Sequence, residues 1–390
     1  MKARFVAALL LLTFAGAALA APKPTSPFAN MKFRNLGPAV SGGRVSTVTG
    51  IPGKPNVYYV GTAGGGLWRT TDNGIKWDNV FKHGDAASIG AVALAPSNSK
   101  EIWLGTGEAN ARNDVLLGRG VYFSPDAGKT WQFKGLKDAG LISNIVVDPT
   151  DPSTVWVAVL GNPWKPGPAR GVFMTTDGGK TWKKVLYVND TTGASDIEMD
   201  PSNPKVLLAG MWTVQRKPWT LLNGSTDGGI WRSEDGGRTW HKLANGLPTT
   251  DPTDRVKIAF APSASKTVYA TMPTRKCILR GSTGSGDHWN CISNNHELAV
   301  RMFYFSSMAV APNDPKTIYF SSFNLMKSTD GGKTAKVIDR GVHVDHHAIW
   351  IDPTDPKRII QGNDGGAFVS VNGGKTWRAF NNLPIEEFYT

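Results

Sequence analysis

The sequence predicts an all-β fold, a seven-bladed β-propeller. Two patterns support this: a short turn motif that recurs seven times and, in step with it, a proline turn that closes an apolar run. Successive copies of the turn motif lie between 42 and 58 residues apart, the length of a four-stranded propeller blade. Seven copies therefore predict seven blades.

The turn motif combines a small hydroxyl residue, an Asp, a Gly and a closing Trp. Three copies are incomplete: the fifth has Gly284 in the Asp place, the sixth ends in Ala335, and the seventh carries Asn372. The copies read TTDNGIKW (70–77), SPDAGKTW (124–131), TTDGGKTW (175–182), SEDGGRTW (233–240), STGSGDHW (282–289), STDGGKTA (328–335) and SVNGGKTW (370–377).

The residue types of the motif favour a structural role. An Asp or Asn side chain can accept hydrogen bonds from backbone amides two residues on, and Gly adopts positive φ without steric cost. The Trp is expected to start the outer strand and to pack between adjacent blades. We therefore expect a folding signal here, not a catalytic one.

The proline turns separate two β-rich runs in every unit. They are IPGKP (from Ile51), APSNS (Ala95), DPTDP (Asp148), DPSNP (Asp200), APSAS (Ala261), APNDP (Ala311) and DPTDP (Asp352). Strand, turn, strand, loop, strand, hairpin, strand is the predicted repeating unit.

The turn motif resembles the Asp box of the bacterial-neuraminidase-repeat (BNR) families, which include sialidases, xyloglucan-active glycoside hydrolases, sortilin receptors and photosystem assembly factors. The resemblance implies an Asp box in the C–D hairpin of each blade. Segments such as VGTAGGGLWRTTDNG and GNDGGAFVSVNGGKTW are similar to exported bacterial repeat proteins often labelled glycosyl hydrolase, which commonly carry a second propeller. Because one scaffold serves hydrolases, receptors and binders in these families, the resemblance is specific for the fold and not for a function.

The N-terminus has the pattern of an export signal. A basic start, an apolar run over 5–20 and the sequence Ala18-Leu19-Ala20 predict a signal peptide at residues 1–20, followed by a loose leader at 21–32. No later segment is long and apolar enough to cross a membrane. We expect a periplasmic or secreted protein with a single propeller at 33–390, either a monomer or the first half of a two-propeller protein.

The net charge of +12 does not predict a nucleic-acid partner. Lys or Arg occupies the sixth or seventh position of six motif copies, which spreads the charge around a rim instead of gathering it in a stripe. The two cysteines, Cys277 and Cys291, flank the degenerate fifth motif. In an oxidising compartment a disulfide is favoured over a free pair or a metal site.

Function is expected where the repeat is violated, on the face that carries the B–C and D–A loops. Units two, three and four have the longest B–C loops, 107–120, 161–171 and 210–229, which predict a wall beside a groove. Trp can stack on sugar faces or peptide side chains, and Arg can grip carboxylates, although packing between the loops is the alternative. The candidate binding residues are Asn110, Arg112, Trp164, Arg170, Asp196, Trp212, Arg216, Trp219 and Asn363.

The segment HVDHHAIW (343–350) is the densest polar cluster. If it opens the inner strand, alternation places His343, Asp345 and His347 on one side, as ligands of a divalent metal or as an acid–base pair. Asn363 and Asp364 are expected to converge with them near the axis. The alternative is a hydrogen-bonded ring that ties the last blade to the first, and no cofactor is required.

Three functions remain open at this point. The first is a binding or scaffolding propeller for a glycan or an extended peptide. The second is a glycoside hydrolase that uses two carboxylates, with Glu108, Asp345 and Asp364 as catalytic candidates and Asp196 and Glu198 as further carboxylates on this face. The third is a receptor or assembly factor that binds a protein. The resemblance supplies no sialidase arginine triad by motif, and the xyloglucan-active enzymes carry one catalytic Asp in each of two propellers.

Overall fold

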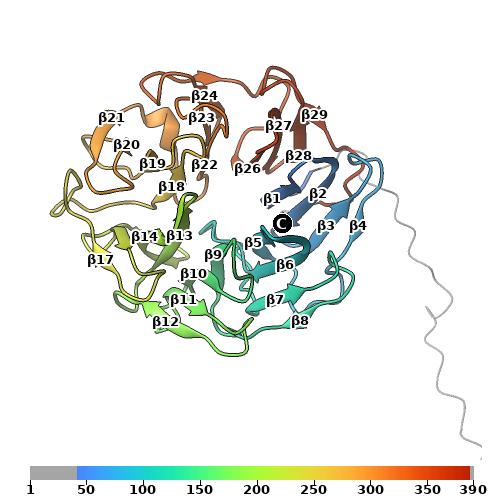
Figure 1. The fold of residues 1–390 in the computed structure, drawn as a ribbon, viewed down its shortest axis with the longest axis horizontal. Coiled ribbons are helices and arrows are strands. Elements are labelled where there is room, and N and C mark those ends of the chain that lie inside the picture. Colours follow the sequence, from blue (N-terminus) through green and yellow to red (C-terminus); the bar gives the residue numbers. More distant parts are fainter. Residues whose placement is uncertain (1–41, 387–390) are drawn as a thin grey trace, which may run out of the picture. The chain divides into compact units, whose positions relative to one another are not determined.

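The computed structural model describes residues 42–386, which form seven antiparallel sheets around one axis and confirm the seven-bladed β-propeller (Figure 1). The predicted signal peptide (1–20), the predicted leader (21–32) and residues 33–41 of the predicted propeller lie outside the described residues. Within 42–386, no helix is long and apolar enough to cross a membrane.

Each blade is built from consecutive strands that run from the axis outward. Blade 1 consists of β1 (Val45–Ile51), β2 (Lys54–Thr62), β3 (Leu67–Thr70) and β4 (Asp78–Asn79). Blade 2 consists of β5 (Ile89–Ala95), β6 (Asn98–Thr106), β7 (Val121–Ser124) and β8 (Gln132–Phe133). Blade 3 consists of β9 (Leu141–Val147), β10 (Val155–Gly161), β11 (Gly171–Thr175) and β12 (Lys183–Leu186).

Blade 4 has an additional strand, β15, paired with the extended end of its second strand. It consists of β13 (Thr192–Asp200), β14 (Asn203–Lys217), β15 (Thr220–Asn223), β16 (Gly229–Ser233) and β17 (His241–Lys242). Blade 5 consists of β18 (Lys257–Phe260), β19 (Val268–Thr271), β20 (Leu279–Ser282) and β21 (Asn290–Ser293), and the 3₁₀ turn η1 (His296–Ala299) follows it. Blade 6 consists of β22 (Ser307–Val310), β23 (Ile318–Ser321), β24 (Leu325–Ser328) and β25 (Lys336–Val337). Blade 7 consists of β26 (His346–Asp352), β27 (Asp355–Asn363), β28 (Gly366–Ser370) and β29 (Arg378–Ala379).

The core of the molecule lies between neighbouring blades. Between blades 1 and 2, for example, Tyr59 and Phe81 pack against Ile102 and Tyr122. Similar apolar clusters fill the other boundaries, including the one between blades 7 and 1. A blade with two apolar faces has no core of its own, so closing the ring is what buries these surfaces.

Blade 7 meets blade 1 without exchanging a strand. The inner strands β26 and β1 contact each other, and Gly42 forms a parallel bridge with Glu386. The backbone N–H of Gly43 also donates to the carbonyl of Asp364 at 3.1 Å. The ring is therefore closed by packing and by a few backbone bonds at its seam.

The turn motif closes each hairpin as a local hydrogen-bonded unit. In blade 3, Asp177 Oδ1 accepts from the Thr175 hydroxyl at 2.7 Å and from the amides of Lys180 and Thr181 at 2.9 Å. These amides lie three and four residues on, so the predicted reach of two residues is wrong. The reason is that Gly178 and Gly179, at φ 70° and 77°, curl the backbone around the carboxylate.

The closing Trp connects neighbouring blades, as expected. The indole N–H groups of Trp131, Trp182 and Trp377 donate to backbone carbonyls just after the outer strand of the preceding blade, at 2.5 to 2.8 Å. The predicted disulfide is also present, with 5.9 Å between the Cα atoms of Cys277 and Cys291.

Candidate functional site

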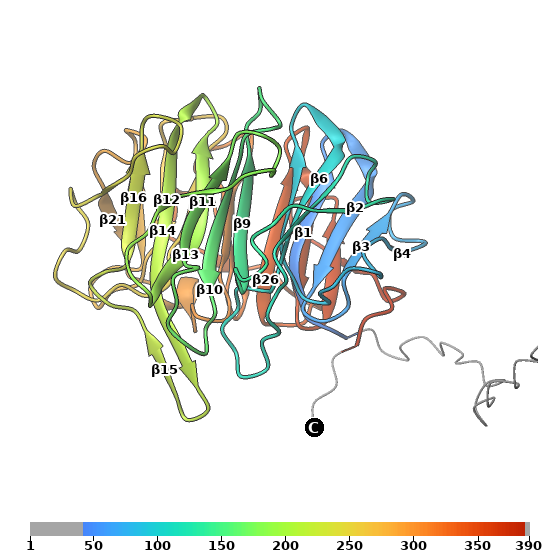
Figure 2. The ribbon, with the colours of Figure 1, turned by 90° about the horizontal axis from the view of Figure 1, so that it is seen from below.

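Three long loops project from one face of the ring, here called the long-loop face. Residues 107–120 leave blade 2 between β6 and β7, and residues 161–171 leave blade 3 between β10 and β11. In blade 4 the corresponding segment is the β14–β15 hairpin, and Figure 2 shows it extending beyond the ring beside the other two loops. The predicted wall is therefore present.

The long loops pack on one another. Trp212 and Val214 of blade 4 are buried in a cluster with Ala111 of blade 2 and Leu160 of blade 3. Arg216 connects all three loops, since its amide donates to Pro163 O at 2.6 Å and its Nε donates to Asn113 Oδ1 at 2.5 Å. Arg216 is thus held by the wall itself.

Five predicted binding residues are buried within the protein. Trp212, Asp196 and Asn363 are 0% exposed, Arg170 is 1% exposed, and Asn110 is 6% exposed. Arg170, at the end of its loop, donates to the carbonyls of Leu160 and Asn162 at the start of the same loop. These bonds hold the two ends of the loop together. These buried side chains contribute to the packing of the face.

Trp219 is the opposite case. It lies at the tip of the β14–β15 hairpin and is 79% exposed. Trp164 of blade 3 is half-buried against the cluster of long loops. An indole ring held on a rigid hairpin can stack on a sugar or an apolar side chain.

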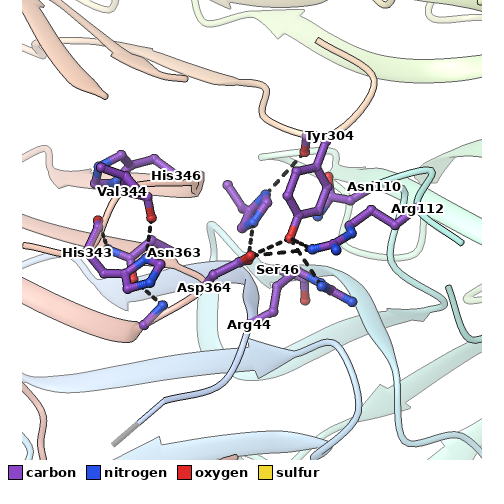
Figure 3. Close-up of polar contacts among 12 residues, drawn as sticks. Arg44, Ser46, Asn110, Arg112, Tyr304, His343, Val344, His346, Asn363 and Asp364 are labelled. Atoms are coloured by element: carbon purple, nitrogen blue, oxygen red, sulfur yellow. Dashed lines mark hydrogen bonds and ion pairs between the residues drawn. The ribbon is translucent and has the colours of Figure 1, made fainter. Parts of the chain in front are cut away.

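A second group of side chains meets near the axis on the same face. We name it the axial cluster, and Figure 3 shows most of it. Its members come from blade 1, the long loop of blade 2, the connections that enter blades 5 and 6, and blade 7. They are Arg44, Glu108, Asn110, Arg112, Arg255, Tyr304, His347 and Asp364.

The cluster begins with a buried ion pair between Arg44 and Glu108. Arg44 Nε lies 3.0 Å from both carboxylate oxygens, and Nη2 lies 2.8 Å from Oε1. Asn110 donates to Glu108 as well, at 3.1 Å. Because Glu108 is 1% exposed and its oxygens are occupied by these donors, it anchors Arg44 and Asn110 within the cluster.

Tyr304 lies at the centre of the cluster. Its hydroxyl accepts from Arg112 Nη1 at 2.7 Å and from Arg44 Nη1 at 3.2 Å, and it donates to Asp364 Oδ2 at 2.5 Å (Figure 3). The Arg112 guanidinium carbon lies 4.6 Å from the centre of the ring. Burial raises the pKa of Tyr304 despite the charge of Arg44, so the phenol stays protonated.

His347 holds the other side of Asp364. Its Nε2 lies 2.7 Å from Asp364 Oδ1, and its Nδ1 lies 3.2 Å from the carbonyl oxygen of Tyr304. Both partners are acceptors, so both bonds form only when the ring carries two protons. Burial works to raise the pKa of Asp364, but the bonds from His347 and Tyr304 and the charge of Arg44 hold it below its ordinary value.

The prediction that His343, Asp345 and His347 share one side of a strand is wrong. Strand β26 begins at His346, and Asp345 precedes it with a φ of 67°, so strand alternation does not apply. His343 is exposed and contacts the carbonyl oxygen of Val344, whereas buried His346 faces Gln361 and Asp339. Among residues 42–386, no three His, Cys, Asp or Glu side chains are arranged to hold a metal ion.

Asp345 nevertheless lies close to the axial cluster. Its amide donates to the carbonyl of Phe323, and its own carbonyl accepts from the amide of Asp364. Burial and the charge of Asp364 raise the pKa of Asp345. The pKa values of these two neighbouring carboxyl groups are thus shifted in opposite directions, and Asp364 is the stronger acid.

Sequence reasoning placed Glu108, Asn110, Arg112, His347 and Asp364 on this face, and the structure brings them together. It missed Arg44, Arg255 and Tyr304. All three lie in or next to the connections that enter a blade, and these connections carry no motif that marks them. The aromatic run RMFYF (301–305) between blades 5 and 6 is the signal that could have identified Tyr304.

Comparisons with known proteins agree with the fold. The BNR/Asp-box repeat family model matches residues 173–184. A xyloglucanase from Paenibacillus sp. is 24% identical over 385 residues, covering 85% of this chain and 35% of its own length. A probable oligoxyloglucan-reducing end-specific xyloglucanase from Neosartorya fischeri is 30% identical over 395 residues, covering 87% of this chain and 45% of its own length.

A solved structure shows the same architecture. The GH74 xyloglucanase from Xanthomonas campestris superposes with a TM-score of 0.63 at 20% identity, covering 89% of this chain and 54% of that one. At this identity the likeness establishes the fold. The chain spans less than half the length of the two curated relatives described above.

Proposed function

We propose that this chain, a seven-bladed BNR/Asp-box propeller, binds a polysaccharide of the β-glucan type on its long-loop face. The observation that carries the proposal is the axial cluster beside the wall of long loops. Its outer groups reach solvent: the side chains of Arg112 and Asp364 are 28% and 11% exposed. Asp114 of the same loop lies 3.7 Å from Arg112 at the edge of the cluster, and its side chain is 42% exposed. Their inner partners are buried and hold them in place, which is how a preorganised binding site is built.

The chemistry of this face suits a sugar chain. Sugar hydroxyls both donate and accept hydrogen bonds, and the exposed edge offers a guanidinium and carboxylates side by side. Trp219 adds an exposed aromatic ring on the wall. The names of the relatives, xyloglucanases, favour xyloglucan as the first polysaccharide to test.

Affinity electrophoresis tests the binding. The mature chain should be retarded in gels that contain xyloglucan and should migrate normally in gels without polysaccharide. Trp219→Ala should weaken binding by about threefold to tenfold, the usual value of one aromatic contact. Ile75→Ala is the control, because Ile75 is 78% exposed in the turn motif of blade 1, on the hairpin between β3 and β4. A wild-type chain that migrates identically through xyloglucan, mixed-linkage glucan and cellulose derivatives would overturn the proposal.

Glycoside hydrolysis is the second candidate. The observation that favours it is the pair Asp345 and Asp364, whose pKa values are shifted apart, as a general acid and its ionised partner require. In this arrangement Asp345 would protonate the leaving oxygen, and Asp364 would act as the base or the nucleophile. Glu108 would only position Arg44.

Release of reducing ends from xyloglucan tests the hydrolase. Asp345→Asn and Asp364→Asn should each lower the rate at least about a hundredfold while xyloglucan binding persists. Asp78→Asn is the control, since Asp78 is an exposed carboxylate on outer strand β4, outside the proposed site. A wild-type chain that binds xyloglucan but releases no reducing ends would exclude hydrolysis and leave the binding function standing.

A further inference from the structure

A cavity of about 290 Å³ lies along the axis behind the axial cluster. Inner strands of several blades line it with polar side chains, among them Asn144 of β9, Glu198 of β13 and Lys257 of β18. Arg255, Ser306 and His347 also line it. The cavity shares Asn110, Arg255 and His347 with the axial cluster, but most of its lining comes from the inner strands and not from the long loops.

Two buried polar groups in the cavity wall lack a partner. Arg255 is 4% exposed and Ser306 is 5% exposed, yet Arg255 Nε and Ser306 Oγ make no hydrogen bond within the described residues. A buried donor without a partner costs free energy comparable to a lost hydrogen bond, so such groups commonly mark a bound species.

The guanidinium of Arg255 is only partly used. Its Nη1 donates to Asn110 Oδ1 at 3.2 Å, and the group lies over the ring of Trp212. Within residues 42–386 no carboxylate lies within ion-pair distance of it. The remaining N–H groups, at Nε and Nη2, form the planar fork that binds the two oxygens of a carboxylate.

The neighbouring charges already have partners. Lys257 Nζ lies 2.8 Å from Asp196 Oδ1, and Asp196 also accepts from Asn144 and from the amide of Ile258. Glu108 is paired with Arg44, and Asp254 accepts from the amide of Arg255 and from Asn223. The opposed charges of Asp196 and Lys257 cancel, which leaves the Arg255 fork as the open cationic group of the cavity.

Glu198 sets the pH range of such a site. Burial and the charge of Asp196 raise the pKa of Glu198 to about 8, against the opposing effects of Lys257 and Asn144. At neutral pH the carboxyl group is therefore protonated and can donate a hydrogen bond to an anion. Above pH 8 it becomes an anion itself and repels one.

We propose that this axial cavity binds a small free carboxylate, held by the Arg255 fork and the Ser306 hydroxyl. Acetate is the smallest probe, and D-glucuronate tests how large an occupant the cavity accepts. Acetamide, which has the same shape without the charge, and chloride, which has the charge without the shape, are the control ligands.

Calorimetric titration of the full chain tests the site. At pH 6.5 acetate should bind saturably and acetamide should not. Ser306→Ala should weaken acetate binding by several-fold, and Arg255→Gln by about tenfold or more. Glu198→Gln should bind acetate at pH 6.5 like the wild type and should lose less affinity at pH 9. Retardation by xyloglucan should be the same for wild type and Ser306→Ala, which keeps the two proposals distinguishable.

Three outcomes would overturn the proposal. They are the absence of saturable acetate binding by the wild type, chloride or acetamide binding as tightly as acetate, and wild-type acetate affinity in both Arg255→Gln and Ser306→Ala. If Arg255→Gln fails to fold, the acetate affinity of Ser306→Ala decides whether the proposal stands. This variant should fold, because it removes one oxygen and leaves the ion pairs in place.

Discussion

The Tyr304 hydroxyl donates a 2.5 Å hydrogen bond to Asp364, which joins the connection between blades 5 and 6 to blade 7. The same oxygen accepts from Arg44 of blade 1 and Arg112 of blade 2. One phenol therefore connects four parts of the ring that are far apart in sequence.

Tyr304→Phe removes this junction without changing the shape of the side chain. Arg44 and Arg112 lose an acceptor and Asp364 loses a donor, so we expect the free energy of unfolding to fall by about 1–3 kcal/mol. Urea unfolding measures the loss. Tyr319→Phe is a matched control, since Tyr319 Oη donates to a single backbone carbonyl at 3.3 Å. Equal effects of the two substitutions would contradict the central role of Tyr304.

Glu108→Gln breaks the buried ion pair beneath the cluster. Arg44 would keep its charge but lose its closest carboxylate, and removing one partner of a buried pair typically costs about 3–5 kcal/mol. The variant should unfold at much lower urea concentration than the wild type. Asp114→Asn, which alters a half-exposed carboxylate 3.6 Å from Arg44, should change stability by no more than about 0.5 kcal/mol. If Glu108→Gln is as stable as the wild type, the Arg44–Glu108 pair does not hold the site together.

The hairpin motif can be tested within a single blade. Asp177→Ala removes the acceptor of two amides and of the Thr175 and Thr181 hydroxyls, and should lower the melting temperature by about 2 °C or more. Asp177→Asn should lose less, because Asn372 Oδ1 of blade 7 still accepts from the Ser370 hydroxyl and the Thr376 amide without a charge. Indistinguishable melting of all three proteins would show that the glycines alone fix the turn.

The fold could be predicted from the sequence because the repeating residues form local contacts within each hairpin. In the complete copies an Asp and a Gly close the hairpin and a Trp packs it against a neighbouring blade, so seven copies were enough to predict seven blades and the face that carries the long loops. Even the degenerate fifth copy keeps its turn, with Gly284 where the Asp would be.

The site was only partly predictable because it depends on closure of the ring. Arg44 and Asp364 are 320 positions apart and meet only when blade 7 reaches blade 1, and Tyr304 enters from a connection without a motif. The burial of side chains was also not predictable from residue type. Arg170 and Trp212 are residue types that often bind ligands, but here Trp212 packs between the long loops and Arg170 bonds to its own loop. Strand alternation failed at Asp345, where a positive φ ends the pattern before the strand starts.

The disulfide supports the hairpin that lacks the Asp. Cys277 and Cys291 are separated by 14 positions, and closing a loop of this size stabilises a fold by about 3 kcal/mol in the chain-entropy account. The double variant Cys277→Ser, Cys291→Ser should lose about that amount. Reduced wild-type protein should unfold at the same urea concentration as the variant. Adding Gly284→Asp to the double variant should recover part of the lost stability. No recovery would show that the Asp does not compensate for the missing disulfide.

Glu198 should make stability depend on pH in the neutral range. Its pKa rises from an ordinary value of 4.5 to about 8 in the folded protein, so the folded state holds a proton that the unfolded state has lost. The stabilisation is complete below pH 4.5 and is lost as the pH rises through 8. Between pH 5 and pH 9 the wild type should therefore lose on the order of 2 kcal/mol relative to Glu198→Gln, after allowance for solvent screening. Urea unfolding of both proteins at pH 5, 7 and 9 measures the difference, and parallel pH profiles would show that Glu198 is ionised in the folded chain.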